Sequence, residues 1–449
     1  MKYTPVALVS LALLGAAAPS GAAPPQSCDL LLAGGRVVDG TGAPWFRADV
    51  CVVGDRIAAV GRLEGIQAKR HIDAARLVVA PGFIDMLGQS EYNVLVDPRA
   101  ASKITQGITT EITGEGSSIA PVNARILAEN REVFERYGVT PDFTTLAGYW
   151  KALERTRPAI NLGTFVGAGG VRNLVLGESD RRATPEELRQ MEAAVAQAME
   201  EGAFGLSTSL QYVPDRFATT EEIVALAKVA RRYGGSYITH QRSESYEIDA
   251  SLDEVFRIAR EAEIPAQVYH LKTSGKPNWG RMPAVLKRLE EARAAGLDVS
   301  ADQYPYIAGQ NSLDANLPLW VRDGGRDKMI ERLKDPQLRA RVKADVGRED
   351  RSWENQYLGS GGAGGVLIVS VVNPALKKYE GRTLEQIAKD EGKDPVDVIM
   401  DIVIADRANT SNVIFMMSED DVRLALKHPL VSLCTDSCLL YTSPSPRDS

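Results

Sequence analysis

The chain has 449 residues, of which 44% are hydrophobic and 25% are charged. These values are ordinary for a globular protein, and the length allows one large α/β barrel with a smaller accessory unit. The formal net charge is -7 and no dense run of Lys and Arg occurs. The composition therefore argues against a nucleic-acid partner and favours a small molecule.

Residues 1–22 have the features of a secretory signal peptide. Lys2 precedes an apolar run from Val6 to Leu14, small residues follow, and we expect cleavage after Ala22. The apolar run is too short to span a bilayer as a stable helix, so an uncleaved anchor is the weaker alternative. We predict a secreted or periplasmic protein with no membrane contact beyond the export signal.

Residues 28–80 have the pattern of short β-strands. Apolar triplets alternate with Gly-rich turns in "DLLLAGGRVVDGTG" and "ADVCVVGDRIAAVG", which predicts a small antiparallel sheet that packs on something larger. The four cysteines of the chain show no framework spacing, and no disulfide is predicted among them: Cys28, Cys51, Cys434 and Cys438.

From Pro81 onward, predicted strands alternate with amphipathic helices, which indicates parallel βα units. Capping signals mark the expected starts of three helices: Thr184 with Glu187, Thr219 with Glu222, and Ser251 with Glu254. Eight strand-like runs lie near Phe83, Thr110, Thr164, Leu206, Ile238, Val268, Val299 and Leu433. Eight strands predict an α/β fold of the TIM (β/α)8 barrel type over residues 81–437.

Residues 309–407 interrupt the alternation before the last strand. They contain charge-rich helices and one predicted strand, "VLIVSVV", and we expect this insertion to cover the mouth of the barrel. Residues 438–449, "CLLYTSPSPRDS", have no periodicity and resemble translated adapter read-through. We interpret them as a non-native tail and expect the natural protein to continue with a further segment.

Three polar residues close predicted strands, where the functional groups of a TIM barrel lie. His240, His270 and Asp436 end the fifth, sixth and eighth strands, and the chain has only four histidines. A catalytic zinc commonly takes three protein ligands, and Glu115 at the end of the second strand could supply the third. Gly114 and Gly116 on either side would allow a close approach, although a solvated loop carboxylate is the alternative interpretation of Glu115.

Several stretches together resemble the amidohydrolase superfamily, specifically the N-acyl-D-amino-acid deacylase (D-aminoacylase) family. They are "APGFID", "DPRAASKITQGITTEITGEG", "FGLSTSLQYVPDRFATTEEIVALAKVARRYGGSYITHQRSE", "VYHLKTSG", "ADQYPYIAG" and "MMSEDDVRLALKHPLVSLCTDS". The resemblance implies zinc-dependent hydrolysis of N-acyl-D-amino acids to a carboxylate and a free D-amino acid. It also implies an accessory β-sandwich completed from both ends of the chain, so residues 28–80 would be its N-terminal part and the sandwich is incomplete here.

The resemblance also assigns roles to individual residues. It places zinc ligands at His240 and His270 and the general acid/base at Asp436. It places substrate contacts at Lys272 and Tyr304.

Two departures from the family pattern affect the metal site. The family has Gly-Asn-Cys-Gly at the second strand, and Glu115 falls at the Cys position if one residue is deleted, whereas an ungapped alignment puts Gly116 there. Leu87 and Gln89 replace the family's His-x-His after "PGFID", and neither is a good zinc ligand. We therefore predict one zinc per chain, bound by Glu115 and the two histidines.

Other interpretations remain open from the sequence. Arg242 in "HQRSE" could bind a substrate carboxylate, or could form a structural ion pair with Glu244 or a loop. A related amidohydrolase, either a dipeptidase or a cyclic-amide hydrolase, would share the barrel. A metal-free binding protein would explain Leu87 and Gln89, although it would leave polar groups unpaired in a pocket.

Overall fold

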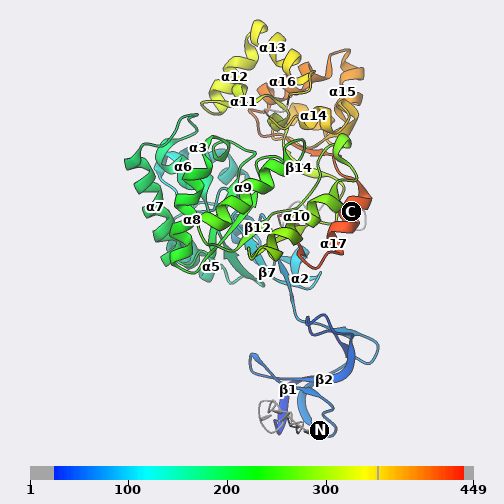
Figure 1. Ribbon diagram of the computed structural model, residues 1–449. Coiled ribbons are helices and arrows are strands. Elements are labelled where there is room, and N and C mark those ends of the chain that lie inside the picture. The colour runs from blue at the N-terminus through cyan, green and yellow to red at the C-terminus, as the bar shows by residue number, and fades with distance from the viewer. Residues whose placement is uncertain (1–24, 351–352, 439–449) are drawn as a thin grey trace, which may run out of the picture. The chain divides into compact units, whose positions relative to one another are not determined.

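The computed structural model describes residues 25–350 and 353–438 (Figure 1). The predicted signal peptide and all of the predicted tail except Cys438 lie outside the described residues. The chain divides into two compact units, Met1–Gly82 and Phe83–Ser449, and each is considered by itself. Among the described residues, no helix combines the length and the apolar character that crossing a bilayer requires.

The N-terminal unit is a five-stranded sheet of mixed direction. Its strands are β1 (Ser27–Val37), β2 (Phe46–Val53), β3 (Arg56–Gly61), β4 (Gln67–Asp73) and β5 (Val78–Val79). β1 pairs antiparallel with β2 but parallel with β4 and β5. The predicted purely antiparallel sheet is therefore wrong, because the chain crosses from β3 to the opposite edge of β1 instead of continuing the meander.

A disulfide joins Cys28 in β1 to Cys51 in β2, with the two Cα atoms 5.5 Å apart. The sequence predicted no particular pairing, although the oxidising compartment expected for an exported protein would permit one. Their separation of 23 residues matches no motif, and the pairing of β1 with β2 is what brings the sulfurs together. Both cysteines are buried with Leu31 in a small apolar cluster of this sheet.

Eight parallel strands form the barrel predicted from the sequence, and the TIM-barrel fold is confirmed. They are β6 (Phe83–Asp85), β7 (Ile108–Thr113), β8 (Asn161–Thr164), β10 (Gly205–Ser209), β11 (Ser236–His240), β12 (Ala266–Val268), β13 (Val299–Gln303) and β17 (Val431–Leu433). A short strand, β9 (Val166–Gly167), extends β8 and pairs with β10.

Hydrogen bonds just beyond β6 and β17 close the barrel between its first and last strands. Gly88 and Ser437 form a parallel bridge. Asp436 N donates to Leu87 O at 2.8 Å, and Gln89 N donates to Ser437 O at 3.2 Å. The closure therefore sets the segment of Leu87 and Gln89 directly beside that of Asp436.

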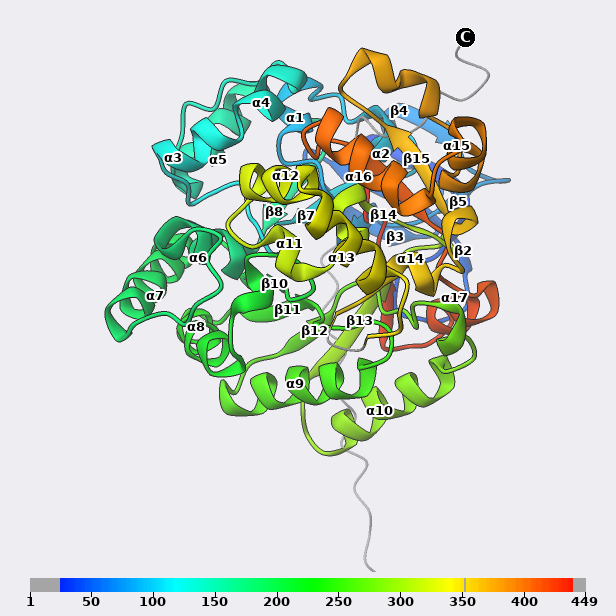
Figure 2. The ribbon, with the colours of Figure 1, turned by 90° about the horizontal axis from the view of Figure 1, so that it is seen from above.

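Long helices surround the strands, as Figures 1 and 2 show for α7 to α10. The outer helices are α5 (Leu146–Thr156), α6 (Ala168–Leu176), α7 (Pro185–Glu200), α8 (Thr220–Arg232), α9 (Ile248–Glu261), α10 (Met282–Ala294) and α17 (Glu419–Leu426). Apolar side chains such as Leu206, Ile223, Leu252 and Val285 pack between strands and helices in one buried core. Shorter helices lie in the βα loops: α1 (Asn93–Val96), α2 (Ala101–Ile104), α3 (Ala124–Glu129) and α4 (Arg131–Tyr137).

Two of the three predicted helix starts are correct. Thr184 caps α7 in a capping box with Glu187, and Thr219 accepts from the backbone at the start of α8. α9 begins at Ile248, before the predicted cap Ser251. Ser251 Oγ instead accepts a hydrogen bond from Ser243 N at 2.8 Å, so it holds the preceding loop and does not cap the helix.

The insertion has its own sheet and its own apolar core. Its strands are β14 (Gly309–Ser312), β15 (Val366–Ser370) and β16 (Ser411–Ile414), in the antiparallel order β14-β16-β15. Its helices are α11 (Leu319–Arg322), α12 (Arg326–Lys334), α13 (Pro336–Val346), α14 (Gln356–Gly359), α15 (Leu384–Glu391) and α16 (Pro395–Ala405). In the view of Figure 2 these helices lie over the barrel. The prediction of a single strand is wrong, because β14 also lies within residues 309–407, and β16, which completes the sheet, begins at Ser411, beyond the predicted end of the insertion.

Candidate metal centre

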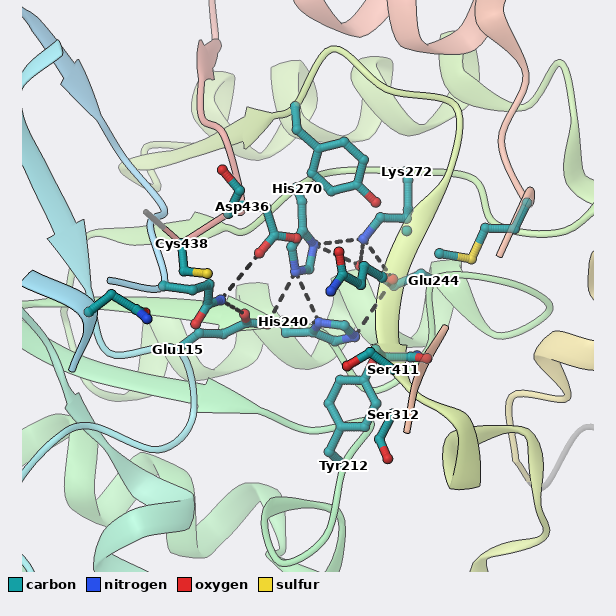
Figure 3. A pocket seen from close by; sticks show the side chains of 18 of the residues that line it. Glu115, Tyr212, His240, Glu244, His270, Lys272, Ser312, Ser411, Asp436 and Cys438 are labelled. Atoms are coloured by element: carbon teal, nitrogen blue, oxygen red, sulfur yellow. Dashed lines mark hydrogen bonds and ion pairs between the residues drawn. The ribbon is translucent and has the colours of Figure 1, made fainter. Parts of the chain in front are cut away.

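Three donor atoms converge at the carboxyl ends of three barrel strands (Figure 3). Glu115 follows β7, His240 ends β11, and His270 follows β12. Glu115 Oε1 lies 2.9 Å from His240 Nδ1 and 3.2 Å from His270 Nε2, and the two nitrogens lie 3.0 Å apart. Among the described residues, this is the one group of at least three His, Cys, Asp or Glu side chains close enough to share a metal ion.

Each histidine has a partner on its other ring nitrogen. His240 Nε2 lies 2.7 Å from Gln211 Oε1, an acceptor, so Nε2 carries the proton and leaves Nδ1 free as a ligand. His270 Nδ1 lies 3.0 Å from a carboxylate oxygen of Glu244, and Nε2 of the same ring faces Glu115 and His240. The contact with Gln211 selects the tautomer of His240 that a metal requires, and Glu244 fixes the orientation of the His270 ring.

Glycines let the Glu115 loop approach the barrel closely. Gly114 and Gly116 have φ of 97° and 61°, and an added Cβ would collide with the backbone of Phe165 or the side chain of Ser209. Burial would raise the pKa of Glu115, but hydrogen bonds with His240 and His270 outweigh it and hold the pKa well below its usual range. Glu115 is therefore an ionised carboxylate paired with two imidazoles and not a solvated loop carboxylate.

Glu244 and Lys272 form a buried ion pair behind His270. Lys272 Nζ lies 2.7 and 2.8 Å from the two carboxylate oxygens of Glu244 and 2.8 Å from His270 Nδ1. Burial and Lys272 lower the pKa of His270, but Glu244 and Glu115 outweigh them and raise it to about 10. The two carboxylates therefore favour the protonated form of His270.

Asp436 faces the three ligands from the last strand (Figure 3). Burial and the nearby charge of Glu115 raise the pKa of Asp436. Asp436 and His270 both have left-handed backbones, with φ of 44° and 35°. Such conformations cost energy for non-glycine residues and cluster at functional sites.

The ligands line a cavity of about 410 Å³ at the carboxyl end of the barrel. Lys272 and Tyr304 line it, where the predicted substrate contacts should be. Its other polar lining comes from Gln89, Asn93, Tyr212, Glu244, Gln310, Asn311, Ser312, Ser411 and Asp436. The insertion strands β14 and β16 therefore form part of the wall, which places the insertion at the site.

Arg242 does not line this cavity. Its guanidinium pairs with Glu254 through two contacts of 2.9 Å and donates to the carbonyl oxygens of Arg216 and Ala218. The structure therefore favours the structural role for Arg242. Its ion-pair partner is Glu254 and not Glu244, because Glu244 pairs with Lys272.

Leu87 and Gln89 do not reconstruct the family's missing ligands. Leu87 is 0% exposed and packs against Ile112 and Phe165 inside the barrel. Gln89 reaches the cavity, but it donates to carboxylates and offers no ligand to the three-residue group.

The sequence did not reveal that three residues support the candidate ligands, although two of them, Gln89 and Glu244, were considered for other roles. Gln211 orients His240, Glu244 orients His270, and Gln89 Nε2 donates to Glu115 Oε2 at 2.7 Å. Gln211 and Glu244 both follow the end of a barrel strand within a few residues. Amides and carboxylates near strand ends have no spacing motif of their own. The position of Gln211 and Glu244 just after a strand was therefore the one signal in the sequence that could have pointed to their role.

The donor set fits zinc, which binds imidazole nitrogens and carboxylate oxygens and in catalytic sites keeps a position open. All three donor atoms point to one place, and each ligand side chain is oriented by a second group. An eight-stranded parallel barrel with this centre at its carboxyl end defines a metal-dependent hydrolase of the amidohydrolase type.

Known proteins agree with that class. No protein-family model matches the chain. The chain is 34% identical to D-aminoacylase of Alcaligenes xylosoxydans xylosoxydans over 423 residues, covering 94% of this chain and 77% of that protein. A structure of D-aminoacylase, described by its binuclear metal centre with one-metal activation and second-metal attenuation, matches with a TM-score of 0.71 and 32% identity and covers 91% of this chain and 76% of that one.

N-acyl-D-glutamate deacylase from Bordetella bronchiseptica is a further structural neighbour. It was solved with zinc and a phosphonate inhibitor that mimics the tetrahedral intermediate. The match has a TM-score of 0.73 and 29% identity and covers 91% of this chain and 76% of that one. The chain belongs to the D-aminoacylase family of amidohydrolases.

Proposed function

We propose that the protein hydrolyses the amide bond of N-acyl-D-amino acids in a zinc-dependent reaction, giving a carboxylate and a free D-amino acid. The convergence of Glu115, His240 and His270 beside Asp436 in one cavity carries this proposal. Relatives named D-aminoacylase and N-acyl-D-glutamate deacylase, the second solved with zinc, support it. They favour a linear amide over the cyclic-amide and dipeptidase alternatives.

Glu115, His240 and His270 would hold one zinc per chain. When bound, zinc would supply a Lewis acid that activates water and polarises the amide carbonyl. The outer contacts from Gln211 and Glu244 would hold the two imidazole rings in the orientation that ligation needs. A metal-free binding protein would not need this arrangement of oriented donors.

Asp436 is suited to proton transfer. Its raised pKa, caused by burial and by Glu115, brings it closer to the working pH than an exposed aspartate would be. It would take the proton of the attacking water and deliver it to the leaving nitrogen. Tyr304 and Lys272 line the same cavity and would contact the substrate.

Stereoselective hydrolysis tests the proposal. The zinc-loaded chain should hydrolyse N-acetyl-D-amino acids faster than their L counterparts, and chelation should abolish the activity reversibly. Asp436→Asn should lower kcat by about 100-fold or more, because it removes a general acid/base. Asp420→Asn, at an exposed position of α17, is the matched control and should keep the wild-type rate. Absence of D-substrate hydrolysis, or wild-type kcat in Asp436→Asn, would contradict the proposal.

We also propose that the protein is exported to a secreted or periplasmic location. The N-terminal sequence supports export, and the Cys28–Cys51 disulfide suits an oxidising compartment. Fractionation of cells that express the full chain tests this. Recovery of the protein with the cytoplasmic fraction, with both cysteines reduced, would contradict it.

A further inference from the structure

The side chain of Gln89 lies between the two carboxylates of the site. Its Nε2 donates to Glu115 Oε2 at 2.7 Å and to Asp436 Oδ1 at 3.2 Å. Both partners are carboxylates, which accept hydrogen bonds when ionised, so the amide nitrogen and not its oxygen faces them. One NH2 group therefore uses its two hydrogens on a candidate metal ligand and on the candidate proton shuttle.

The two oxygens of Glu115 consequently have different partners. Oε1 lies with His240 Nδ1 and His270 Nε2, where an ion would bind, whereas Oε2 is occupied by Gln89. The hydrogen bond to Oε2 favours ligation through Oε1 alone. A second cation between Glu115 and Asp436 would have to displace the amide that already joins them.

The neighbouring position also offers no ligand. Leu87 is 0% exposed and apolar, and its carbonyl oxygen accepts from Asp436 N at 2.8 Å. Gln89 N donates to Ser437 O at 3.2 Å in the same closure of the barrel. The same backbone contacts therefore fix the positions of Asp436 and Gln89. Because both backbones are fixed, the side-chain amide of Gln89 is held within reach of Asp436 Oδ1.

We propose that Gln89 is a positioning residue that takes the place of a second metal ion: its amide holds Asp436 toward the site, and the side chains of Leu87 and Gln89 supply no second set of ligands, so the centre is mononuclear. The inference rests on the proposed function for its effect on catalysis, but its effect on metal number can be measured independently. A neutral amide with two donors screens the repulsion between two buried carboxylates without adding a charge. The D-aminoacylase described by second-metal attenuation has a binuclear centre, and this chain should not show that attenuation.

Metal titrations of the full chain test the first half of the inference. With zinc, or with cobalt followed by its visible absorption spectrum, the wild type should bind a single ion, and excess metal should not lower its activity. The double variant Leu87→His, Gln89→His restores two imidazoles and should bind a second ion that lowers activity when in excess. A second tightly bound ion in the wild type would overturn the inference, as would a double variant that still binds one.

The variant Gln89→Leu tests positioning. It keeps the approximate size of the side chain and removes both hydrogen bonds, so kcat should fall by about 10- to 100-fold while KM stays nearly unchanged and one zinc remains. Gln197→Leu is the matched control, because Gln197 donates to a carboxylate of Glu201 at 2.9 Å on the exposed face of α7. Wild-type kcat in Gln89→Leu would overturn the positioning role.

The two proposals fail in different ways. A wild type that binds one zinc but hydrolyses no N-acyl-D-amino acid overturns the proposed function, while the metal counts still decide whether Gln89 replaces an ion. If Gln89→Leu does not fold, the metal counts in the wild type and in the double histidine variant still decide whether Gln89 takes the place of a second ion.

Discussion

At the scale of single residues, the candidate metal centre depends on groups that would not touch the ion. His240 has the right tautomer only because Gln211 Oε1 accepts from Nε2 at 2.7 Å. Gln211 is 8% exposed, so water could not easily replace it. The residue types that bind metal were visible in the sequence, but the groups that orient them were not.

Gln211→Leu should weaken zinc binding by about 10- to 100-fold, because His240 would lose the acceptor that fixes its proton on Nε2. Competition with a chromophoric chelator measures the affinity. Gln190→Leu, at an exposed position of α7, serves as the control and should bind zinc like the wild type. Unchanged affinity in Gln211→Leu would show that the hydrogen bond does not orient the ligand.

Zinc binding should strengthen as pH rises. Glu244 and Glu115 outweigh burial and Lys272 and raise the pKa of His270 to about 10 in the metal-free protein, so at neutral pH zinc must displace a proton. Below that pKa the affinity should fall with falling pH. Calorimetry in buffers of different ionisation enthalpy should detect about one proton released per zinc near neutral pH. A pH-independent affinity with no proton release would contradict this assignment.

At the scale of elements, the sequence predicted the strands that take part in the βα alternation and missed two that do not. All eight barrel strands were predicted, including polar ones such as β7 and β10, because each has its place in that alternation. β14 and β16 read "GQNS" and "SNVI", and β16 pairs with β14 and with β15 through contacts more than 40 residues away in the chain. No local pattern could show that sheet, although β14 and β16 contribute to the wall of the cavity.

Helix starts show the same difference between local and long-range causes. Thr184 and Glu187 form a capping box within α7, which is a local motif and was predicted. Ser251 also has a hydroxyl and a Glu three residues later, Glu254, but its hydroxyl accepts from Ser243 N in the preceding loop. The sequence signal was the same in both cases, and tertiary structure decided between them.

Thr184→Ala should destabilise the chain by about 1 kcal/mol, because it removes the N-cap of α7. Thr184→Ser keeps the hydroxyl and should therefore retain most of the stability that Thr184→Ala loses. Chemical denaturation with linear extrapolation measures the difference. Equal stability of the alanine and serine variants would contradict the capping role.

At the scale of the whole molecule, the fold brings together residues that are far apart in the chain. Gln89 and Asp436 are separated by 347 positions, yet the closure between β6 and β17 sets them within hydrogen-bonding distance. The barrel fold and its strand-end residues therefore predicted where a site should be. They could not predict which neighbours would complete it, because those contacts arise only when the first and last strands meet.

In the proposed function, Glu115, His240 and His270 together hold one zinc ion per chain. Zinc content of the purified full chain, measured in the wild type beside Glu115→Ala and His240→Ala, tests it most directly. His428→Ala is the matched control, since His428 lies away from the cavity and contacts Glu290. We expect one zinc per chain in the wild type and in His428→Ala, and no bound zinc in Glu115→Ala or His240→Ala. A zinc-free wild type, or zinc retained in Glu115→Ala, would contradict it.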